Sequence, residues 1–370
     1  MDSTLFLYRI RRMDWWMFSA MLALMVLGVM FIYSASYRGD GLAVPNHYRR
    51  QIVWGLAGII CLVVLTQLDY QRLGESSWLW YSIAVVLLVL VLLMGKTISG
   101  ASRWLDVFGI RVQPSEFAKL ATLLALARFL SRPDRDVTNP RTVVQAGLMI
   151  AIPFILIFEE PDLGTAAVFL PMVFVMLFVA GVPLKTLSFL VLLAVLLLPA
   201  GWLIIDDYQK NRILVFFDAE RDPLNAGWNK IQSEIAVGSG GVTGKGFLAG
   251  TQNVLGFLPR TVAPTDFIYS VIAEEMGFVG SALVLSLYAA MLIGVIHAAL
   301  VSRDKLGRLL SVGVATILFS HVFVNIAMTV GLLPITGLPL PLISYGGSFI
   351  VSTLCGLGLV QSVYVRRARR

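Results

Sequence analysis

The chain reads Asp266-Phe-Ile-Tyr-Ser-Val-Ile-Ala-Glu274-Glu275-Met-Gly-Phe-Val-Gly280 and then stays apolar as far as Leu300. A run of about 20 apolar residues is long enough to cross the hydrocarbon of a bilayer as a helix. This run begins with three carboxylates, and a carboxylate inside a bilayer costs at least about 2.5 kcal/mol on insertion scales. The stretch therefore predicts a membrane-spanning helix whose acidic side chains are retained for a task.

Similar apolar runs fill most of the remaining chain. Hydrophobic residues make up 58% of the sequence, charged residues make up 14%, and the mean hydropathy is +0.82. A soluble domain carries about 25% charged residues. Backbone polar groups in a bilayer must be satisfied within each span, so helices are expected. We expect one polytopic all-α membrane domain, residues 1–370, with about ten transmembrane helices at roughly 14–34, 51–68, 77–95, 114–131, 143–158, 162–182, 184–205, 266–300, 308–332 and 341–365.

The basic residues indicate how these spans are oriented. An even number of spans places both termini on one side, and the short loops on that side carry more Lys and Arg than those opposite. Lys and Arg are enriched in cytoplasmic loops. We therefore expect both termini in the cytoplasm and residues 206–265 outside, as a long loop between helices 7 and 8. The net charge of +7 is then mainly a topology signal, and no nucleic-acid partner is expected.

Features that suggest other classes of protein have simpler explanations. The run from Trp15 to Tyr33 is longer than the apolar core of a cleaved signal peptide, so we expect a retained span. Cys61 and Cys355 fall within apolar spans, which predicts small buried side chains and not a disulfide or a metal site. The three histidines are scattered, and no pair of them has metal-ligand spacing.

The loop 206–265 is too long for a simple connection. It contains the apolar run Ile213–Phe217, and Trp228, Ile231 and Ile235 recur in it at helical spacing. This pattern fits two short amphipathic helices on the outer membrane surface. A loop folded over the helix bundle without lipid contact fits equally well.

The same loop contains a glycine-rich stretch, Gly238–Gly246. It lacks the residues of a P-loop, since Ser239 replaces the first glycine and Gly246 replaces the final Ser or Thr. Two interpretations remain. It is a turn whose N–H groups can approach an anion, with Lys245 beside it, or it is a plain flexible turn.

Asp266 lies at the start of the acidic span. Thr265 is a suitable N-cap, and a carboxylate in the first turn of a helix is favoured by the dipole, so a structural role competes with a chemical one. Glu274 and Glu275 follow eight and nine residues later. At about 100° per residue, at most one of them shares a face with Asp266. We expect the other to pair inside the bundle.

Other polar side chains lie within or beside spans. Glu116 and Lys119 are spaced i, i+3 and should pair within a membrane helix. Asp162 follows Pro161 at the start of a span, where a structural N-terminal role is again an alternative. The side chains that could bind substrate or line a cavity are Arg103, Trp104, Glu116, Lys119, Asp162, Lys245, Glu274 and Ser344. Together with Asp266 they suit a transporter or an enzyme acting on a lipid-linked substrate.

Eight stretches resemble the SEDS family, and they occur in that family's order over almost the whole chain. They are Arg103-Trp-Leu105, Gln113-Pro-Ser-Glu-Phe-Ala-Lys119, Glu160-Pro-Asp-Leu-Gly-Thr165, Gln232-Ser-Glu-Ile-Ala-Val-Gly-Ser-Gly-Gly241, Gly244-Lys-Gly246, Thr265-Asp-Phe-Ile268, Ala273-Glu-Glu-Met-Gly277 and Pro339-Leu-Pro-Leu-Ile-Ser-Tyr-Gly-Gly-Ser348. The stretch Gly250-Thr-Gln252 and the short tails resemble the elongation members of the family more than the division members.

The resemblance implies a ten-helix peptidoglycan glycosyltransferase that polymerises lipid II outside the bacterial cytoplasmic (inner) membrane during elongation. It also implies a class B penicillin-binding protein as transpeptidase partner, beside other membrane proteins of the elongation complex. Asp266 matches the family's essential aspartate, and Glu116, Lys119 and Asp162 match positions used around its central cavity. The segment Leu258–Asp266, which contains Arg260, is longer than the family pattern by two residues and lacks its Glu and His.

Glycosyl transfer gives Asp266 a chemical role, because a base must take the proton of the acceptor 4-hydroxyl. The leaving lipid pyrophosphate needs cationic stabilisation, from Lys245, Arg212, Arg103 or a divalent cation such as Mg²⁺ or Mn²⁺. The small residues from Gly277 to Ala282 offer a face for a partner helix. The alternatives are a lipid II flippase, a division-type polymerase and a non-catalytic scaffold.

Overall fold

The structure is a computed structural model of the chain, and it describes all residues except 1–2, 38–45, 99–100, 108, 260 and 368–370. Arg260, part of the altered segment before Asp266, therefore lies outside the described residues. Long helices dominate the rest. They are α2 (Trp15–Ser36), α3 (His47–Gln67), α5 (Ser77–Met94), α6 (Pro114–Ser131), α7 (Pro140–Glu159), α8 (Leu163–Ala180), α9 (Leu184–Ile204), α13 (Ile268–Leu300), α14 (Lys305–Thr329) and α15 (Gly347–Val365).

Nine of these helices, within the described part of the chain, are long and apolar enough to span a membrane. The tenth, α6, contains Glu116, Lys119 and Arg128 and packs against α5, α14 and α7 inside the bundle. The predicted all-α membrane fold is confirmed. One predicted span begins too early, because α15 starts at Gly347 and the preceding residues from Pro341 form a non-helical turn.

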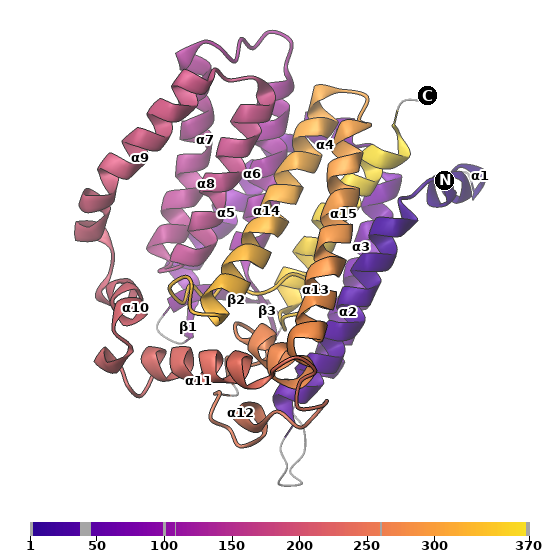
Figure 1. Cartoon of the computed structure of the whole chain (residues 1–370). Coiled ribbons are helices and arrows are strands. Elements are labelled where there is room, and N and C mark those ends of the chain that lie inside the picture. Colours follow the sequence, from indigo (N-terminus) through magenta and orange to yellow (C-terminus); the bar gives the residue numbers. More distant parts are fainter. Residues whose placement is uncertain (1–2, 38–45, 99–100, 108, 260, 368–370) are drawn as a thin grey trace.

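The helices run between two ends of the bundle (Figure 1). One end is covered by α11 (Ala226–Ser239), which lies across the long helices. The short helix α1 (Ser3–Arg11) and the last turn of α15 lie at the opposite end. The chain therefore enters and leaves the bundle at the same end, as an even number of spans requires.

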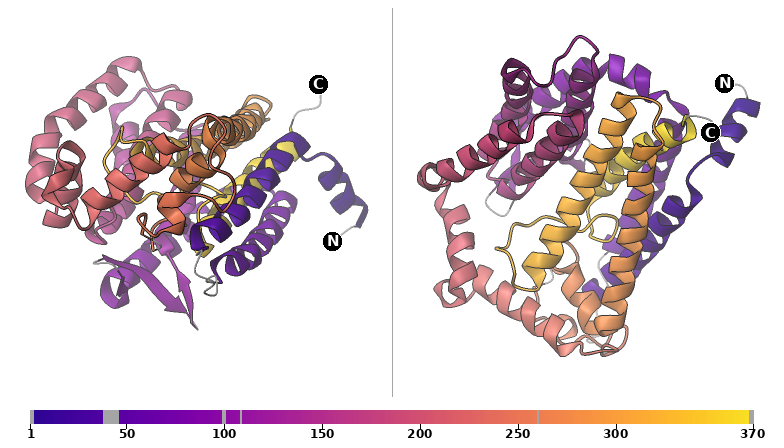
Figure 2. Two further views of the ribbon diagram at one scale, coloured as in Figure 1. Left: turned by 60° about the horizontal axis from the view of Figure 1, so that its bottom comes forward. Right: turned by 45° about the horizontal axis from the view of Figure 1, so that its top comes forward.

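A small sheet joins α5 to α6, and the sequence pattern did not predict it. Its antiparallel strands are β1 (Lys96–Ile98), β2 (Ala101–Val107) and β3 (Ile110–Val112), in that order. Figure 2 shows the sheet projecting beside the helices. Strands this short leave only a weak period-2 signal, and the neighbouring helical patterns obscure it.

The long loop is mostly helical, as predicted. It contains α10 (Asp207–Phe217), the 3₁₀ turn η1 (Ala219–Arg221), α11 and α12 (Thr251–Val254). One face of α11 packs on the bundle, where the Ser233 hydroxyl donates to the Thr329 carbonyl at 2.8 Å. Trp228, Ile231 and Ile235 lie 36%, 37% and 43% exposed on α11. Both expected helices are confirmed, and this apolar stripe fits contact with lipid.

The acidic span was predicted as one continuous helix, and this is wrong at Gly277. Its φ of 63° breaks α13, and an added Cβ there would lie 2.4 Å from the Gly244 nitrogen. The break lets the glycine-rich turn dock on the helix, where the Phe278 N–H donates to the Gly241 carbonyl at 2.9 Å. Gly277, Gly280 and Ser281 are buried within the chain. The predicted partner-binding face is therefore wrong as well.

The α3–α15 interface differs from expectation at its two cysteines. Cys61 and Cys355 are partly exposed, although the sequence predicted buried side chains. Their side chains lie near each other across the interface. Both thiols are free in the structure.

Candidate active site

Asp266 lies in a turn before α13 and not in the first turn of that helix. The helix begins at Ile268, and the structure gives its cap residue, Phe267, no side-chain cap bond, so the predicted N-cap role of Thr265 is wrong. The Asp266 N–H donates to the Val262 carbonyl at 2.9 Å, and its carbonyl accepts from Asn325 Nδ2 at 2.9 Å. The backbone of Asp266 is thus fixed by bonds that leave its carboxyl group outside the capping of α13.

The carboxyl group of Asp266 is partly buried beside a cation. An added Cβ at Gly337 would lie 3.5 Å from Asp266 Oδ2 and 3.4 Å from Arg212 Nη1, so both side chains crowd this glycine. Burial raises the pKa of Asp266 above its ordinary value, and the charge of Arg212 opposes that shift. A carboxyl group with a raised pKa near a cation is suited to accept a proton.

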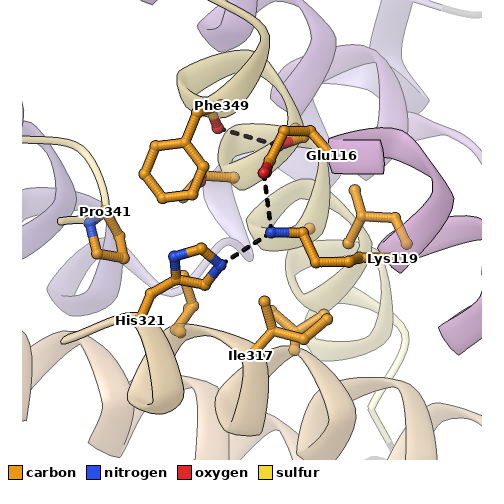
Figure 3. A pocket seen from close by; sticks show the side chains of 12 residues that line it. Glu116, Lys119, Ile317, His321, Pro341 and Phe349 are labelled. Atoms are coloured by element: carbon orange, nitrogen blue, oxygen red, sulfur yellow. Dashed lines mark hydrogen bonds and ion pairs between the residues drawn. The ribbon is translucent and has the colours of Figure 1, made fainter. Parts of the chain in front are cut away.

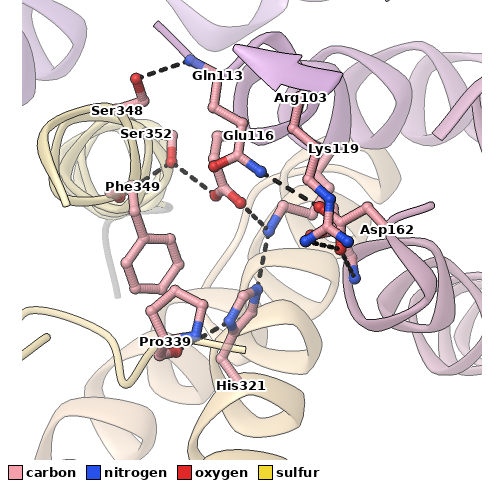
Figure 4. A network of polar contacts seen from close by, with 11 residues as sticks. Arg103, Gln113, Glu116, Lys119, Asp162, His321, Pro339, Ser348, Phe349 and Ser352 are labelled. Carbon is pink, nitrogen blue, oxygen red and sulfur yellow. Dashed lines mark hydrogen bonds and ion pairs between the residues drawn. The ribbon is translucent and has the colours of Figure 1, made fainter. Parts of the chain in front are cut away.

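Arg103 and Asp162 form a charged pair, and the charges of both shift the pKa of Asp266. Arg103 Nη1 lies 3.7 Å from Asp162 Oδ1, and Gln113 Nε2 donates to Asp162 Oδ2 at 3.3 Å (Figure 4). Arg103 lowers the pKa of Asp266 and Asp162 raises it. The structure therefore brings together Asp266, Asp162 and Arg103, which the sequence had offered as separate site candidates. Asp162 also caps α8, so its structural role is real too.

Glu160 is a buried acid next to Pro161 and Asp162, and it was not among the predicted site residues. Its side chain is 0% exposed, and neither carboxylate oxygen has a hydrogen-bond partner in the described structure. Burial raises its pKa to about 8, the charge of Asp162 adds to the shift, and Arg103 opposes it. A carboxyl group with this pKa is mainly protonated at neutral pH, so Glu160 adds little negative charge beside Arg103.

Glu116 and Lys119 form the predicted pair, with Lys119 Nζ 3.0 Å from Glu116 Oε1. The pair is almost fully buried and has a third member, His321, whose Nε2 lies 2.8 Å from Lys119 Nζ. These side chains line a cavity of about 20 Å³ (Figure 3), which is room for one water molecule. Ser352 donates to Glu116 Oε2 at 3.3 Å.

His321 could not be found from the sequence, because no metal-ligand spacing or local motif marks it. Its partner Lys119 lies about 200 residues away in the chain, on another helix. Only the packing of α6 against α14 brings the two side chains together.

Ser344 supports the Asp266 turn. Its hydroxyl donates to the Thr265 carbonyl and accepts from the Leu340 N–H at 2.8 Å. The Tyr345 N–H adds a bond to the Pro264 carbonyl at 2.8 Å. The segment before α15 therefore holds the turn that carries Asp266. A direct contact of Ser344 with substrate stays a prediction.

Lys245 and Glu274 lie in a different cluster. Lys245 Nζ is 2.7 Å from Glu274 Oε1, which also accepts from Thr251 Oγ1 at 3.0 Å. Glu275 accepts from the Ser34 hydroxyl. Both glutamates thus bind partners other than Asp266 and fasten the long loop to α13 and α2. The proposed role of Lys245 in stabilising a pyrophosphate stays a prediction, as does the substrate role of Glu274.

Trp104 follows Arg103 on β2. Successive side chains of a strand point to opposite faces, so Trp104 points away from the face that carries Arg103 towards Asp162. Its substrate role also stays a prediction.

A metal site was left open by the sequence. Within the described residues, no group of three or more His, Cys, Asp or Glu side chains is arranged to hold a metal ion. These residues therefore do not fit a resident metal held by protein ligands alone. The cations placed at Asp266 by the protein itself are Arg212 and Arg103.

Comparison with known proteins now identifies the family. A model of the FtsW, RodA and SpoVE proteins, described as cell cycle protein, matches residues 14–369. The chain belongs to this family. The peptidoglycan glycosyltransferase MrdB of Escherichia coli K12 is 39% identical over 350 residues, covering 94% of this chain and 92% of MrdB.

Solved structures of this family share the fold. RodA of Thermus thermophilus superimposes with a TM-score of 0.72 at 32% identity, covering 97% of this chain and 98% of RodA. A chain from a peptidoglycan synthase complex that coordinates polymerization and crosslinking reaches a TM-score of 0.80 at 33% identity, covering 97% and 99%. Similarity to MrdB and RodA favours the elongation members of the family over a division-type member.

Proposed function

We propose that this chain polymerises lipid II into glycan strands, with Asp266 as the general base. It is a peptidoglycan glycosyltransferase, in line with its relatives MrdB and RodA. The observation that carries the catalytic assignment is the Asp266 carboxyl group. It is partly buried, lies outside the capping of α13, and is surrounded by Arg212, Arg103 and Asp162.

The reaction is a single displacement. Asp266 takes the proton of the acceptor sugar 4-hydroxyl as its oxygen attacks the donor anomeric carbon. The bond from that carbon to the lipid pyrophosphate breaks, and the pyrophosphate leaves with both electrons. Arg212 and Arg103 stabilise the negative charge on the leaving group. One base suffices, because inversion at the anomeric carbon needs no covalent enzyme intermediate.

We also propose an orientation for the chain in the membrane. We place the α11 end of the bundle outside the cytoplasmic membrane and both termini in the cytoplasm. The larger number of basic residues in the short loops at the terminal end supports this orientation. The exposed apolar stripe of α11 then lies at the outer membrane surface.

The partner we propose is a class B penicillin-binding protein that crosslinks the strands, with other membrane proteins of the elongation complex around the pair. The support is the similarity to a chain from a complex that coordinates polymerization and crosslinking. Its contact surface on this chain is not the face at Gly277 and Gly280, since both are buried.

The test uses the purified full-length protein in detergent or liposomes with lipid II. Glycan polymer should form, and addition of the cognate transpeptidase should raise the rate. A Mg²⁺ or Mn²⁺ requirement stays a prediction, tested by repeating the assay with EDTA and then with each ion restored. Transbilayer movement of lipid II without any polymer would instead support a flippase. If the protein neither moves nor polymerises lipid II, the result would support a scaffold.

A further inference from the structure

The buried group of Glu116, Lys119 and His321 lies near the Asp266 turn and is not used by the proposed chemistry. His321 contacts both Lys119 of this group and the segment that supports the Asp266 turn. Its Nε2 lies 2.8 Å from Lys119 Nζ, and its Nδ1 lies 3.1 Å from the Pro339 carbonyl oxygen. Figure 4 shows the imidazole ring between the two.

These two contacts assign the tautomer. A lysine ammonium has only donors, so Nε2 of His321 must accept from Lys119. A carbonyl oxygen only accepts, so Nδ1 must carry the proton and donate to Pro339. One neutral tautomer satisfies both bonds, and His321 is 0% exposed, so water cannot substitute for either partner from the bulk.

The Pro339 carbonyl belongs to the segment that holds Asp266. Asn325, one turn after His321 on α14, donates to the Leu338 carbonyl at 2.7 Å and to the Asp266 carbonyl at 2.9 Å. The neighbouring Leu340 N–H binds the Ser344 hydroxyl, which donates to Thr265. Two side chains on one face of α14 thus fix consecutive carbonyls of the segment that supports the Asp266 turn.

We propose that His321, as the Nδ1–H tautomer, is a positioning residue that links the Glu116–Lys119 pair to the Pro339 segment and so orients Asp266. Its effect on catalysis rests on the proposed function, whereas the tautomer and the link do not. Misplacing a catalytic group by about 1 Å can cost about 100-fold in rate, so a link of this kind should affect kcat more than KM.

The experiment compares three variants of the full-length protein. An Asn amide nitrogen takes the place of Nδ1, so His321→Asn keeps a donor for Pro339, and one water in the enlarged cavity can accept from Lys119. A Gln amide takes the place of Nε2, so His321→Gln keeps an acceptor for Lys119 and loses the Pro339 bond. His321→Leu loses both bonds. The exposed histidine variant His297→Asn is the matched control.

With lipid II as substrate, His321→Asn should keep kcat within about threefold of the wild-type value. His321→Gln and His321→Leu should lose about tenfold or more in kcat with KM changed less than twofold. Equal losses in the Asn and Leu variants, or a Leu variant with wild-type kcat, would overturn the positioning role. Absence of polymer from the wild-type protein would instead count against the proposed function.

A second measurement does not depend on activity. The chain has three histidines, so ¹⁵N-histidine NMR of the wild-type protein resolves few signals, and the His321→Asn spectrum assigns one of them. We expect a protonated Nδ1 and an unprotonated Nε2 at His321. A signal from the Nε2–H tautomer, or from a doubly protonated ring, would contradict the link to Lys119 and Pro339.

Discussion

Asp266 is the residue on which the proposed chemistry depends. Asp266→Asn keeps the shape of the side chain but cannot accept a proton, and Asp266→Ala removes the group. Both should lower the rate of lipid II polymerisation by about 100-fold or more, with thermal unfolding in detergent close to wild type. The matched control is Asp218→Asn, at an exposed acid of the loop that precedes Asp266. Near-wild-type polymerisation by Asp266→Asn would exclude the general-base role.

Glu160 predicts a pH dependence of stability. Its pKa is raised from the ordinary 4.5 to about 8 by burial, so the folded protein keeps a proton that the unfolded chain releases above pH 4.5. The free energy of unfolding should therefore fall as pH rises from about 4.5 to 8, by up to about 1.4 kcal/mol per pH unit from this group. Below pH 4.5 Glu160 does not destabilise the folded protein, and above pH 8 its destabilising effect has reached its full size.

Glu160→Gln should remove this slope, since the amide keeps the shape and does not titrate. Thermal unfolding of both proteins between pH 5 and 9 measures the difference. The control is Glu159→Gln, at the exposed neighbour, which should keep the wild-type slope. An unchanged slope in Glu160→Gln would mean that Glu160 ionises normally in the folded protein.

Within α6, the Glu116–Lys119 pair should behave as a coupled unit. Removing one member leaves a buried charge without its partner, which costs about 3 kcal/mol. Glu116→Gln alone should lower the unfolding temperature, and the double variant Glu116→Gln, Lys119→Met should recover part of the loss. Melting curves of the two single variants and the double variant complete the cycle. Strictly additive losses would show that the two residues do not interact.

The break in α13 depends on Gly277. Its φ of 63° is unfavourable for other residues, and a Cβ there meets the Gly244 nitrogen and the Val242 carbonyl. Gly277→Ala should cost about 2 kcal/mol or more in stability and loosen the docked turn. Gly147→Ala on α7 is the control, because nothing lies within 4 Å of its added Cβ. Limited proteolysis of the loop reports the loosening, and equal protection in both variants would contradict it.

Topology is a prediction about the whole molecule. In a Cys61→Ser, Cys355→Ser background, a cysteine at Leu224, which is 86% exposed in the long loop, should react with an impermeant maleimide added outside. A cysteine at Asp134, in the exposed turn between α6 and α7, should react only after the membrane is opened. The reverse pattern would place Asp266 on the cytoplasmic side and remove it from an outer-face polymerase.

The sequence by itself determined the membrane class, the approximate spans, the helical loop and the Glu116–Lys119 pair. Apolar run length and i, i+3 spacing are local properties, so they can be read along the chain. The same local rules missed the break in α13 and misplaced its partner face, because the break depends on a turn some 30 residues earlier that docks against Gly277.

Only the tertiary structure decided which acids and bases meet. Asp266 lies with Arg212, Arg103 and Asp162 because α10, β2 and the start of α8 converge at the α11 end of the bundle. The sequence offered Lys245 and Glu274 as candidates for the same site as Asp266, yet these two residues pair with each other in a different cluster. His321 joins Lys119 across two helices. Contacts between residues far apart in the chain depend on helix packing, and no local pattern in the sequence records that packing.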